Sequence, residues 1–112
     1  TRYRDKVRGG ALNWLSYPKE RLEGRTVIVV DDILDEGNTL KSVCEYCLEQ
    51  GAARTYSVVL VEKIHDRRIA GARAECVGLR IEDKFVFGYG LDYKGYLRNA
   101  PGIFAVADAE LA

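Results

Sequence analysis

The chain has 112 residues, of which 47% are hydrophobic, and its 17 basic side chains balance 17 acidic ones. This length supports one small domain with its own core, because domains commonly run to about 100–150 residues. The zero net charge argues against a role that depends on bulk electrostatics, such as coating nucleic acid or lying on an anionic membrane. No apolar run approaches the roughly 20 residues of a transmembrane helix. We therefore expect a cytoplasmic enzyme or binding module, with no nucleic-acid and no membrane partner.

The first 24 residues are read as loop, strand and connector in turn. Residues 1–10 are polar and basic and end in two glycines, which is typical of a mobile loop with a glycine hinge. Residues 11–17 predict a strand, with Leu12 and Trp14 on one side and Asn13 on the other, and residues 18–24 predict a turn-rich connector. The chain opens with Thr1 and contains no methionine, so we expect that an N-terminal part is missing.

A strand, a helix and a second strand follow in the middle of the chain. Residues 26–30 are an uninterrupted β-branched run, which predicts a strand covered on both faces in a parallel sheet. Apolar residues then follow helical spacing from Leu40 to Leu48, and Gly51 is a good C-terminal cap. Residues 56–61 predict a second buried strand. This order predicts a βαβ unit with a parallel strand pair.

The remaining elements are shorter. Residues 77–81, 85–87 and 103–107 are further strand candidates. Three cysteines cannot all pair, which suits a reducing compartment. Cys44 and Cys47 have the spacing of a redox or zinc motif, but they share the apolar face of the predicted helix, so we expect them to be small buried hydrophobic residues.

The chemistry is concentrated between the first strand and the helix. Asp31, Asp32, Asp35 and Glu36 place four carboxylates within six positions, at the edge of a parallel sheet where ligands bind. A simple helix cap by Asp35 or Glu36 explains one or two acids. It explains four poorly, because crowded carboxylates repel one another unless a cation, sugar hydroxyls or an altered pKa relieves them.

Gly37 and the small polar residues after it supply a site for an anion. Gly37 lets the backbone turn tightly, so that the following amides, the hydroxyl of Thr39 and the helix N-terminus can face one phosphate. A loop that accepts sugar hydroxyls at its start and a phosphate at its end fits a ribose 5-phosphate.

Two motifs give the sequence a resemblance to a known family. Residues 27–40, VIVVDDILDEGNTL, resemble the phosphoribosyl pyrophosphate signature of type I phosphoribosyltransferases. Residues 83–93, DKFVFGYGLDY, with LVEK at 60–63 and YLRN at 96–99, resemble the hypoxanthine phosphoribosyltransferases in particular. The resemblance implies an α/β fold, the Rossmann-like type I phosphoribosyltransferase fold with a mostly parallel central sheet flanked by helices. It implies one partial domain over residues 1–112, without the N-terminal segment.

The resemblance implies roles for the acidic segment. Asp31 and Asp32 match the pair that holds the ribose hydroxyls, directly or through Mg²⁺, and Asp35 matches the catalytic general base near purine N7. The resemblance also implies that the 5′-phosphate is bound by five consecutive residues, Asp35, Glu36, Gly37, Asn38 and Thr39. Many members carry Thr in place of Glu36, so we expect Glu36 to offer its amide and to turn its side chain outward, because a carboxylate repels a phosphate.

Further roles fall on the second half of the chain. Lys63 matches the lysine that binds the exocyclic O6 of the purine, Phe85 the aromatic that stacks on it, and Val86 a backbone contact to its edge. Asp92 matches an acid of the second Mg²⁺ site and Arg98 a pyrophosphate contact.

Two basic tracts have weaker assignments. Tyr3, within the loop of residues 1–10, matches a tyrosine of the family's catalytic loop, which closes over the site during turnover. A later basic tract, with the only histidine, is expected to be a solvated loop or a subunit contact; it comprises His65, Arg67 and Arg68.

The implied reaction is purine salvage. The 5-phosphoribosyl group moves from phosphoribosyl pyrophosphate to a 6-oxopurine, hypoxanthine or guanine, with Mg²⁺ as cofactor, in a homodimer or homotetramer. The alternative is a catalytically silent nucleotide-binding regulator on the same fold. The retained base-binding residues, Lys63, Phe85 and Asp92, favour the enzyme. A relative that acts on xanthine or adenine differs only in its contacts to the base.

Overall fold

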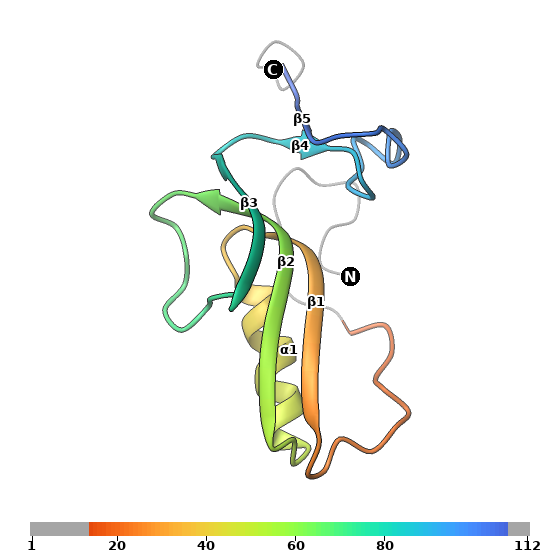
Figure 1. The fold of residues 1–112 in the computed structure, drawn as a ribbon, viewed down its shortest axis with the longest axis vertical. Helices are drawn as coiled ribbons and strands as arrows, with labels where there is room; N and C mark the ends of the chain where they lie inside the picture. The colour runs from red at the N-terminus through yellow and green to blue at the C-terminus, as the bar shows by residue number, and fades with distance from the viewer. Residues whose placement is uncertain (1–13, 108–112) are drawn as a thin grey trace.

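A computed structural model describes residues 14–107 of the chain. The expected loop of residues 1–10 and Tyr3 lie outside the described residues. In chain order the elements are β1 (Thr26–Leu34), α1 (Asn38–Glu49), β2 (Arg54–Ile64), β3 (Cys76–Glu82), β4 (Val86–Phe87) and β5 (Phe104–Ala105) (Figure 1).

The main sheet is parallel and has the strand order β1-β2-β3. Val30 is the register partner of Val58 across the first pair, and Val59 is that of Val77 across the second. Because α1 connects β1 to β2, the predicted βαβ unit with a parallel pair is confirmed. The carboxyl ends of all three strands therefore meet at one edge.

The strands extend further toward that edge than the apolar runs predict. β1 continues through Leu34, so Asp31 and Asp32 lie within the strand and not after it. β2 continues through Ile64 and carries Lys63 at its end. The strands remain paired beyond the hydrophobic residues, as Leu34 with Glu62 shows, so both strands extend past the hydrophobic pattern.

Glycines mark both ends of α1. Gly37 occupies the N-cap position with φ 93°, and no side chain caps the helix, so capping by Asp35 or Glu36 is not found. At the other end Gly51 has φ 92°, and its amide donates to the carbonyl of Leu48 at 3.0 Å. The predicted glycine terminator is confirmed, because only glycine adopts this left-handed conformation without a steric penalty.

The helix packs its apolar stripe onto the sheet. Leu40 and Cys47 are buried, Cys44 is half-buried, and the three cysteines of the chain are all free, in agreement with the expected hydrophobic role of the first two thiols. Burial raises the pKa of the Cys47 thiol, with a smaller contribution from Cys44. Within residues 14–107 no helix is long and apolar enough to cross a membrane.

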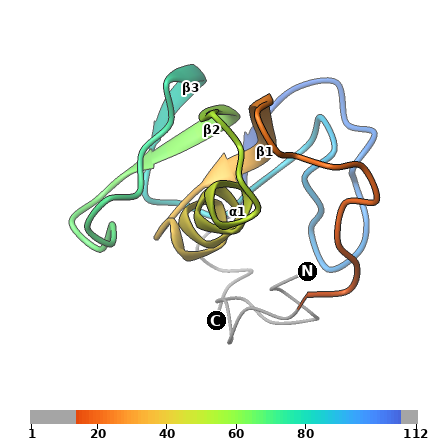
Figure 2. The same ribbon diagram turned by 90° about the horizontal axis from the view of Figure 1, so that it is seen from below.

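Among the described residues, other elements cover only one face of the main sheet. Leu34, Leu40 and Val59 form the core between the sheet and α1, which lies on a single side of the strands (Figure 2). On the opposite face Ile28 is 63% exposed and Val30 is 74% exposed. The expectation that this strand is covered on both faces is therefore wrong for the described part of the chain, since a β-branched run does not specify what packs on it.

The predicted strand at residues 11–17 is also not found where the structure describes it. Residues 14–17 lie in no strand. Instead, Trp14 stacks on Tyr17 with ring centroids 4.7 Å apart, and both rings contact Tyr46 of α1 at 4.9 and 5.0 Å. Aromatic packing on the helix replaces the ladder bonds that a strand would make.

The last two strands form a small sheet of their own. β4 pairs antiparallel with β5, with Val86 opposite Ala105. Both strands are shorter than the sequence predicts. The pair lies at the end of the molecule where β1, β2 and β3 terminate (Figure 1), so the segment that leads into it passes the same edge.

Gly37 is packed too closely for any side chain. A Cβ atom at this position would collide with the Cβ atom of Ala72 and would carry a strained φ. We expect Gly37→Ala to lower the free energy of unfolding by about 2–4 kcal/mol, the sum of backbone strain and overpacking. Gly24→Ala is the matched control, because Gly24 has φ 72° and open space around it, and should cost only about 1–2 kcal/mol.

Denaturant titrations of the two variants and of Gly37→Ala/Ala72→Gly measure the effect. The second substitution should recover the part due to the collision. Equal losses for Gly37→Ala and Gly24→Ala would contradict the packing argument.

Candidate functional site

A buried lysine marks the site at the carboxyl edge of the sheet. The side chain of Lys63, at the end of β2, is only 6% exposed, and its Nζ lies 3.3 Å from Oδ2 of Asp35. The same Nζ lies 4.8 Å from the centre of the Phe85 ring. A buried ammonium is stable only with a partner of opposite charge. Segments after β1 and β3 therefore meet at the end of β2.

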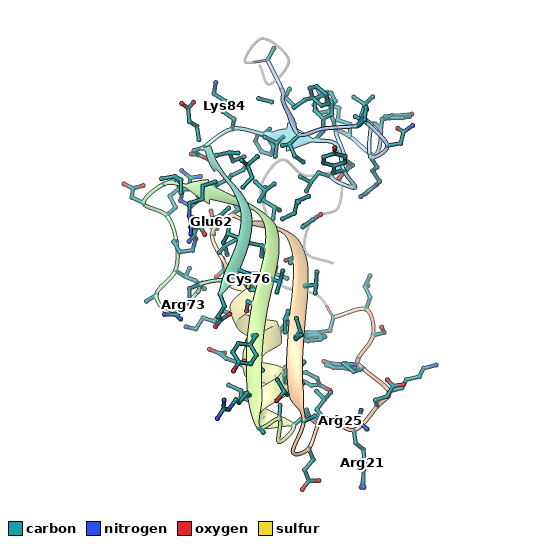
Figure 3. The ribbon with its side chains drawn as sticks, viewed as in Figure 1. Arg21, Arg25, Glu62, Arg73, Cys76 and Lys84 are labelled. Atoms are coloured by element: carbon teal, nitrogen blue, oxygen red, sulfur yellow. The ribbon has the colours of Figure 1, made fainter. Side chains whose placement is uncertain are left out.

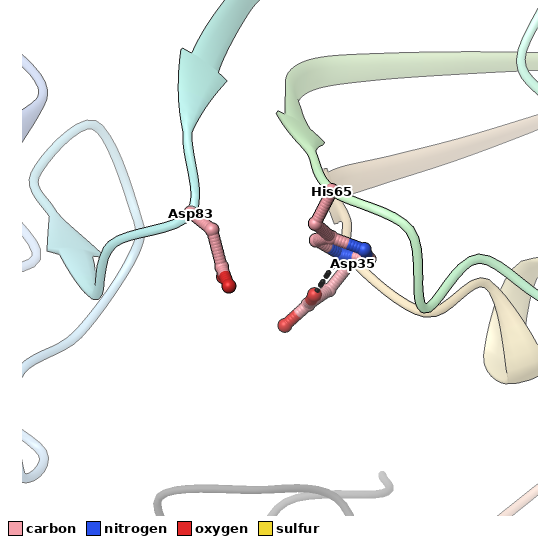
Figure 4. A group of neighbouring side chains, drawn as sticks. All are labelled: Asp35, His65 and Asp83. Carbon is pink, nitrogen blue, oxygen red and sulfur yellow. Dashed lines mark hydrogen bonds and ion pairs between the residues drawn. The ribbon is translucent and has the colours of Figure 1, made fainter.

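A histidine contacts the other carboxylate oxygen of Asp35. Oδ1 of Asp35 lies 2.7 Å from Nε2 of His65, whose side chain is only 4% exposed (Figure 4). The backbone amide of Arg67 donates to Nδ1 of the same ring at 3.0 Å. The expectation that this tract is a solvated loop is wrong for His65, because the ring turns inward to the carboxylate.

Arg67 and Arg68 also make internal contacts. Arg67 donates through two nitrogens to the carboxylate of Asp83, at 2.7 and 3.0 Å. The hydrogen bonds and charge of Arg67 lower the pKa of Asp83, and the same hydrogen bonds raise the pKa of Arg67. This fork joins the segment after β2 to the segment after β3.

Arg68 ties together the ends of β1 and β2. It donates from Nε to the carbonyl of Asp35 and from Nη2 to the carbonyl of Lys63, each at 2.8 Å. Its Nη1 also lies 3.7 Å from Oε1 of Glu62, the β2 residue labelled in Figure 3, and the same oxygen is 3.9 Å from Nε of Arg80 in β3. The main chain on both sides of the Lys63–Asp35 pair is therefore fixed by one guanidinium.

Asp35, His65 and Asp83 have ligand atoms that all lie within 4.8 Å of one another. This spacing alone would suit a metal ion. Arg67, however, bonds to Asp83 and lies 3.8 Å from Oδ1 of Asp35, while His65 occupies that same oxygen. A guanidinium already supplies the positive charge that these acids need, so the group is explained without a metal.

Asp31 and Asp32 form a separate acidic pair in β1. The pKa of Asp31 is raised to about 6, chiefly by burial and also by the neighbouring carboxylate of Asp32, through a shared hydrogen bond and its charge. The amide of Asp32 donates to Oδ1 of Asp31 at 2.8 Å and acts in the opposite direction. Each of the two adjacent carboxylates disfavours the charged form of the other, and a hard cation or hydroxyl donors would stabilise both charges. This donor set therefore fits Mg²⁺.

The predicted phosphate segment turns into α1 at Gly37. The first-turn amides of the helix, from Asn38 onward, follow this left-handed residue and form an N-terminus suited to an anion. Glu36 differs from the expectation. Its side chain is half-buried, and the side-chain nitrogen Nδ2 of Asn38 donates to its Oε2 at 3.5 Å. The carboxylate stays beside the turn because Asn38 offers it a donor, so the expected outward orientation is not found.

Asp92 and Arg98 lie in the loop between β4 and β5 and contact other residues of that loop. Asp92 accepts from the amide of Gly95 at 2.7 Å and lies 3.5 Å from Arg98. Arg98 also donates to the carbonyl of Gly90 at 2.8 Å. Val86 lies in β4, directly after Phe85, with its backbone in the β4–β5 ladder. Of the predicted base-binding residues, the structure places Lys63 and Phe85 in contact.

Two surface hollows lie along α1 and not at this edge. One of about 430 Å³ is bordered by Trp14, Tyr17 and Tyr46. The other, of about 230 Å³, lies beside Cys44 and Ser57. Neither hollow is lined by Lys63 or Asp35, so charge and hydrogen bonding among the described residues identify the site.

Comparisons with known proteins bear on this arrangement. The sequence pattern of the family described as "Phosphoribosyl transferase domain" matches residues 1–94. The chain is 40% identical over 87 residues to the hypoxanthine-guanine phosphoribosyltransferase of Aquifex aeolicus, covering 78% of this chain and 48% of that protein. It is 42% identical over 82 residues to the enzyme of the same name from Staphylococcus aureus strain Mu50, covering 73% and 45%. The chain thus spans about half the length of these relatives.

Solved structures agree. A hypoxanthine phosphoribosyltransferase from Staphylococcus aureus superimposes with a TM-score of 0.85 at 32% identity, covering all of this chain and 61% of that one. A variant of the Trypanosoma cruzi hypoxanthine phosphoribosyltransferase, complexed with the product IMP, gives a TM-score of 0.79 at 30% identity, covering 87% and 51%. Both proteins are named hypoxanthine phosphoribosyltransferases, and both share the fold of this chain.

The raised pKa of Asp31 predicts a pH-dependent stability. The folded protein holds this proton up to about pH 6, whereas the ordinary value is 3.8. The contribution of protonated Asp31 to the stability of the folded protein is therefore complete below about pH 3.8, and it is lost as the pH rises through about 6. Asp31→Asn removes the titration. Between pH 4 and 7 the wild type should lose about 1–2 kcal/mol of unfolding free energy relative to this variant, after a discount for partial exposure.

Denaturant unfolding of both proteins across this pH range checks the difference. Parallel pH profiles for wild type and Asp31→Asn would contradict the argument.

Proposed function

The chain belongs to the phosphoribosyltransferase family, and from this premise we propose that the protein transfers the 5-phosphoribosyl group of phosphoribosyl pyrophosphate to N9 of hypoxanthine or guanine. The products are IMP or GMP and pyrophosphate. The names of the relatives support this substrate class. Since the chain spans about half of those relatives, the activity of the whole protein is part of the proposal.

The contact between Lys63 and Asp35 carries the proposal. Nζ and Oδ2 lie 3.3 Å apart and thus present a donor and an acceptor side by side. A 6-oxopurine offers the complementary pair on one edge, because its keto O6 accepts and its neighbouring N7 carries a proton to donate. Adenine has an amino group in place of O6 and offers no acceptor to the ammonium. This pair therefore favours a keto purine.

Phe85 offers an aromatic ring on which the purine base can stack. Its ring already lies 4.8 Å from Nζ of Lys63, so a purine bound to the lysine would reach the aromatic. Stacking on an aromatic ring stabilises any purine. The polar pair therefore determines which purine is preferred, while Phe85, with the backbone of Val86, adds affinity and orientation.

Asp35 is the base of the proposed reaction. The bond from N9 to C1′ of the ribose forms as the bond from C1′ to the pyrophosphate oxygen breaks. Charge on the purine is relieved when its N7 proton passes to Asp35. A positioned general base contributes about 10²–10⁴-fold to rate, and Lys63 stabilises the charge on O6.

The sugar phosphate would lie beside the base. Asp31 and Asp32 accept from the ribose hydroxyls, and the 5′-phosphate lies at the N-terminus of α1, on the amides that follow Gly37 and on the Thr39 hydroxyl. Glu36 takes part through its backbone. The left-handed conformation of Gly37 supports this placement, since it turns the chain into the helix.

Mg²⁺, held by Asp31 and Asp32 with Asp92 as a further ligand, would offset the charge of the leaving pyrophosphate. Arg98 contacts the pyrophosphate. Tyr3 and the rest of residues 1–10, which lie outside the described residues, would serve to exclude water from the site, as the family resemblance implies. We place the enzyme in the cytoplasm as a homodimer or homotetramer; its free cysteines support a reducing compartment.

Lys63→Met tests the choice of base. Methionine fills a similar volume without the charge, so we expect the affinity for GMP or IMP to fall about 10–100-fold, as for the loss of a charge-assisted hydrogen bond. The affinity for AMP should change much less. Calorimetric titration with Mg²⁺ present measures both. Because the substitution leaves Asp35 without its lysine partner, Lys63→Met/Asp35→Asn is the control for folding. An equal loss for AMP and GMP would contradict the proposed base contact.

Asp35→Asn tests the reaction itself. The amide keeps the shape of the side chain but accepts no proton, so kcat should fall about 10²–10⁴-fold while the GMP affinity changes little. Steady-state assays with hypoxanthine and phosphoribosyl pyrophosphate measure this. Wild-type protein that binds GMP without turnover would support the regulator instead. Wild-type protein with neither property would contradict the proposed function.

A further inference from the structure

The only histidine of the chain is buried against the proposed base. The side chain of His65 is 4% exposed and makes two hydrogen bonds, one through each ring nitrogen. Nε2 lies 2.7 Å from Oδ1 of Asp35, and Nδ1 lies 3.0 Å from the amide nitrogen of Arg67. The ring is thus held at both of its nitrogens.

The Arg67 contact determines where the imidazole carries its proton. A backbone N–H can only donate, so Nδ1 of His65 must accept and carries no hydrogen. The proton of the neutral ring is then on Nε2, and that N–H donates to Asp35. A doubly protonated ring would direct a second N–H against the amide of Arg67. The geometry therefore favours a neutral ring with one defined donor direction.

The two oxygens of Asp35 consequently have different surroundings. Oδ1 accepts from His65, and the guanidinium of Arg67 lies 3.8 Å from it. Oδ2 faces Nζ of Lys63 at 3.3 Å. Only Oδ2 lies beside the lysine that would bind O6 of a 6-oxopurine, so it is the oxygen placed for the neighbouring N7 proton.

Resting on the proposed function, we propose that His65 is a positioning residue for the transfer reaction: its Nε2–H holds Oδ1 of Asp35 and so presents Oδ2 to the N7 proton of the purine. His65 touches no substrate in this role. It prevents rotation of the carboxylate, which would otherwise exchange the two oxygens. A fixed base keeps its alignment with the proton it receives, and small misplacements of a reacting group are costly.

A purely structural role for His65 uses the other nitrogen. If the ring only anchors the segment after β2, the essential bond is the one that Nδ1 accepts from Arg67. The two roles therefore depend on different atoms, and two amide side chains separate them. Asparagine places its oxygen near Nδ1 and retains the acceptor, while glutamine reaches the position of Nε2 and retains the donor.

The experiment compares His65→Gln with His65→Asn in the full protein. We expect kcat to fall at least tenfold in His65→Asn, with a change in the Kd of GMP of less than threefold, and His65→Gln to retain at least five times the kcat of His65→Asn. Thermal unfolding of both variants checks the fold. Equal kcat values, or a higher kcat for His65→Asn, would overturn the positioning role.

A second measurement needs neither variant nor turnover. Long-range ¹H–¹⁵N spectra of the wild-type imidazole should show a protonated Nε2 and a bare Nδ1 at pH 7. A ring protonated at Nδ1 would overturn the inference, whatever the activity. Wild-type protein that lacks turnover would instead overturn the proposed function. Normal wild-type turnover with no difference between the two variants would overturn the role of His65 alone.

Discussion

The ammonium of Lys63, buried at the end of a central strand, is the constraint on which the site depends. A charge in that position requires a partner, and the parallel register supplies one. Leu34 of β1 is the partner of Glu62 in β2, so the next residues along, Asp35 just after β1 and Lys63 near the end of β2, lie side by side. The site is thus a consequence of strand register, and the sequence separation of the two residues is bridged by α1.

Three cationic or aromatic groups then fix the geometry of this pair. Arg68 bonds to the carbonyls on both sides of it. Phe85 closes the apolar side, and Arg67 connects the segment after β2 to Asp83 after β3. The carboxylate and the ammonium are therefore held at one separation before any ligand arrives, which lowers the cost of ordering them on binding.

Some of this was predictable from local sequence because the signals are local. The β-branched run, the helical spacing from Leu40 and the two glycines at 37 and 51 are read from neighbouring residues. The strand, the helix and the turns at both glycines are confirmed. The importance of Lys63 came from the resemblance to a family, since a lysine at a strand end is otherwise ordinary. Its burial and its contact with Asp35 are the structural reasons for that importance.

Other features depend on contacts between distant segments and left no local signal. His65, Arg67 and Arg68 form a polar run that reads as a solvated loop, and only the convergence of three segments turns them inward. The position of the single histidine, two residues after Lys63, was the available hint. Likewise, the apolar run around Ile28 predicted the strand correctly, but the cover that it also predicted for the outer face is not found among the described residues.

The most direct test of this account is a crystal structure of the protein with bound IMP. The account predicts that O6 of the hypoxanthine lies within hydrogen-bond distance of Nζ of Lys63, that N7 faces Oδ2 of Asp35, and that the ring packs against Phe85. A nucleotide bound elsewhere, with the Lys63–Asp35 pair unchanged and out of contact with the base, would contradict it.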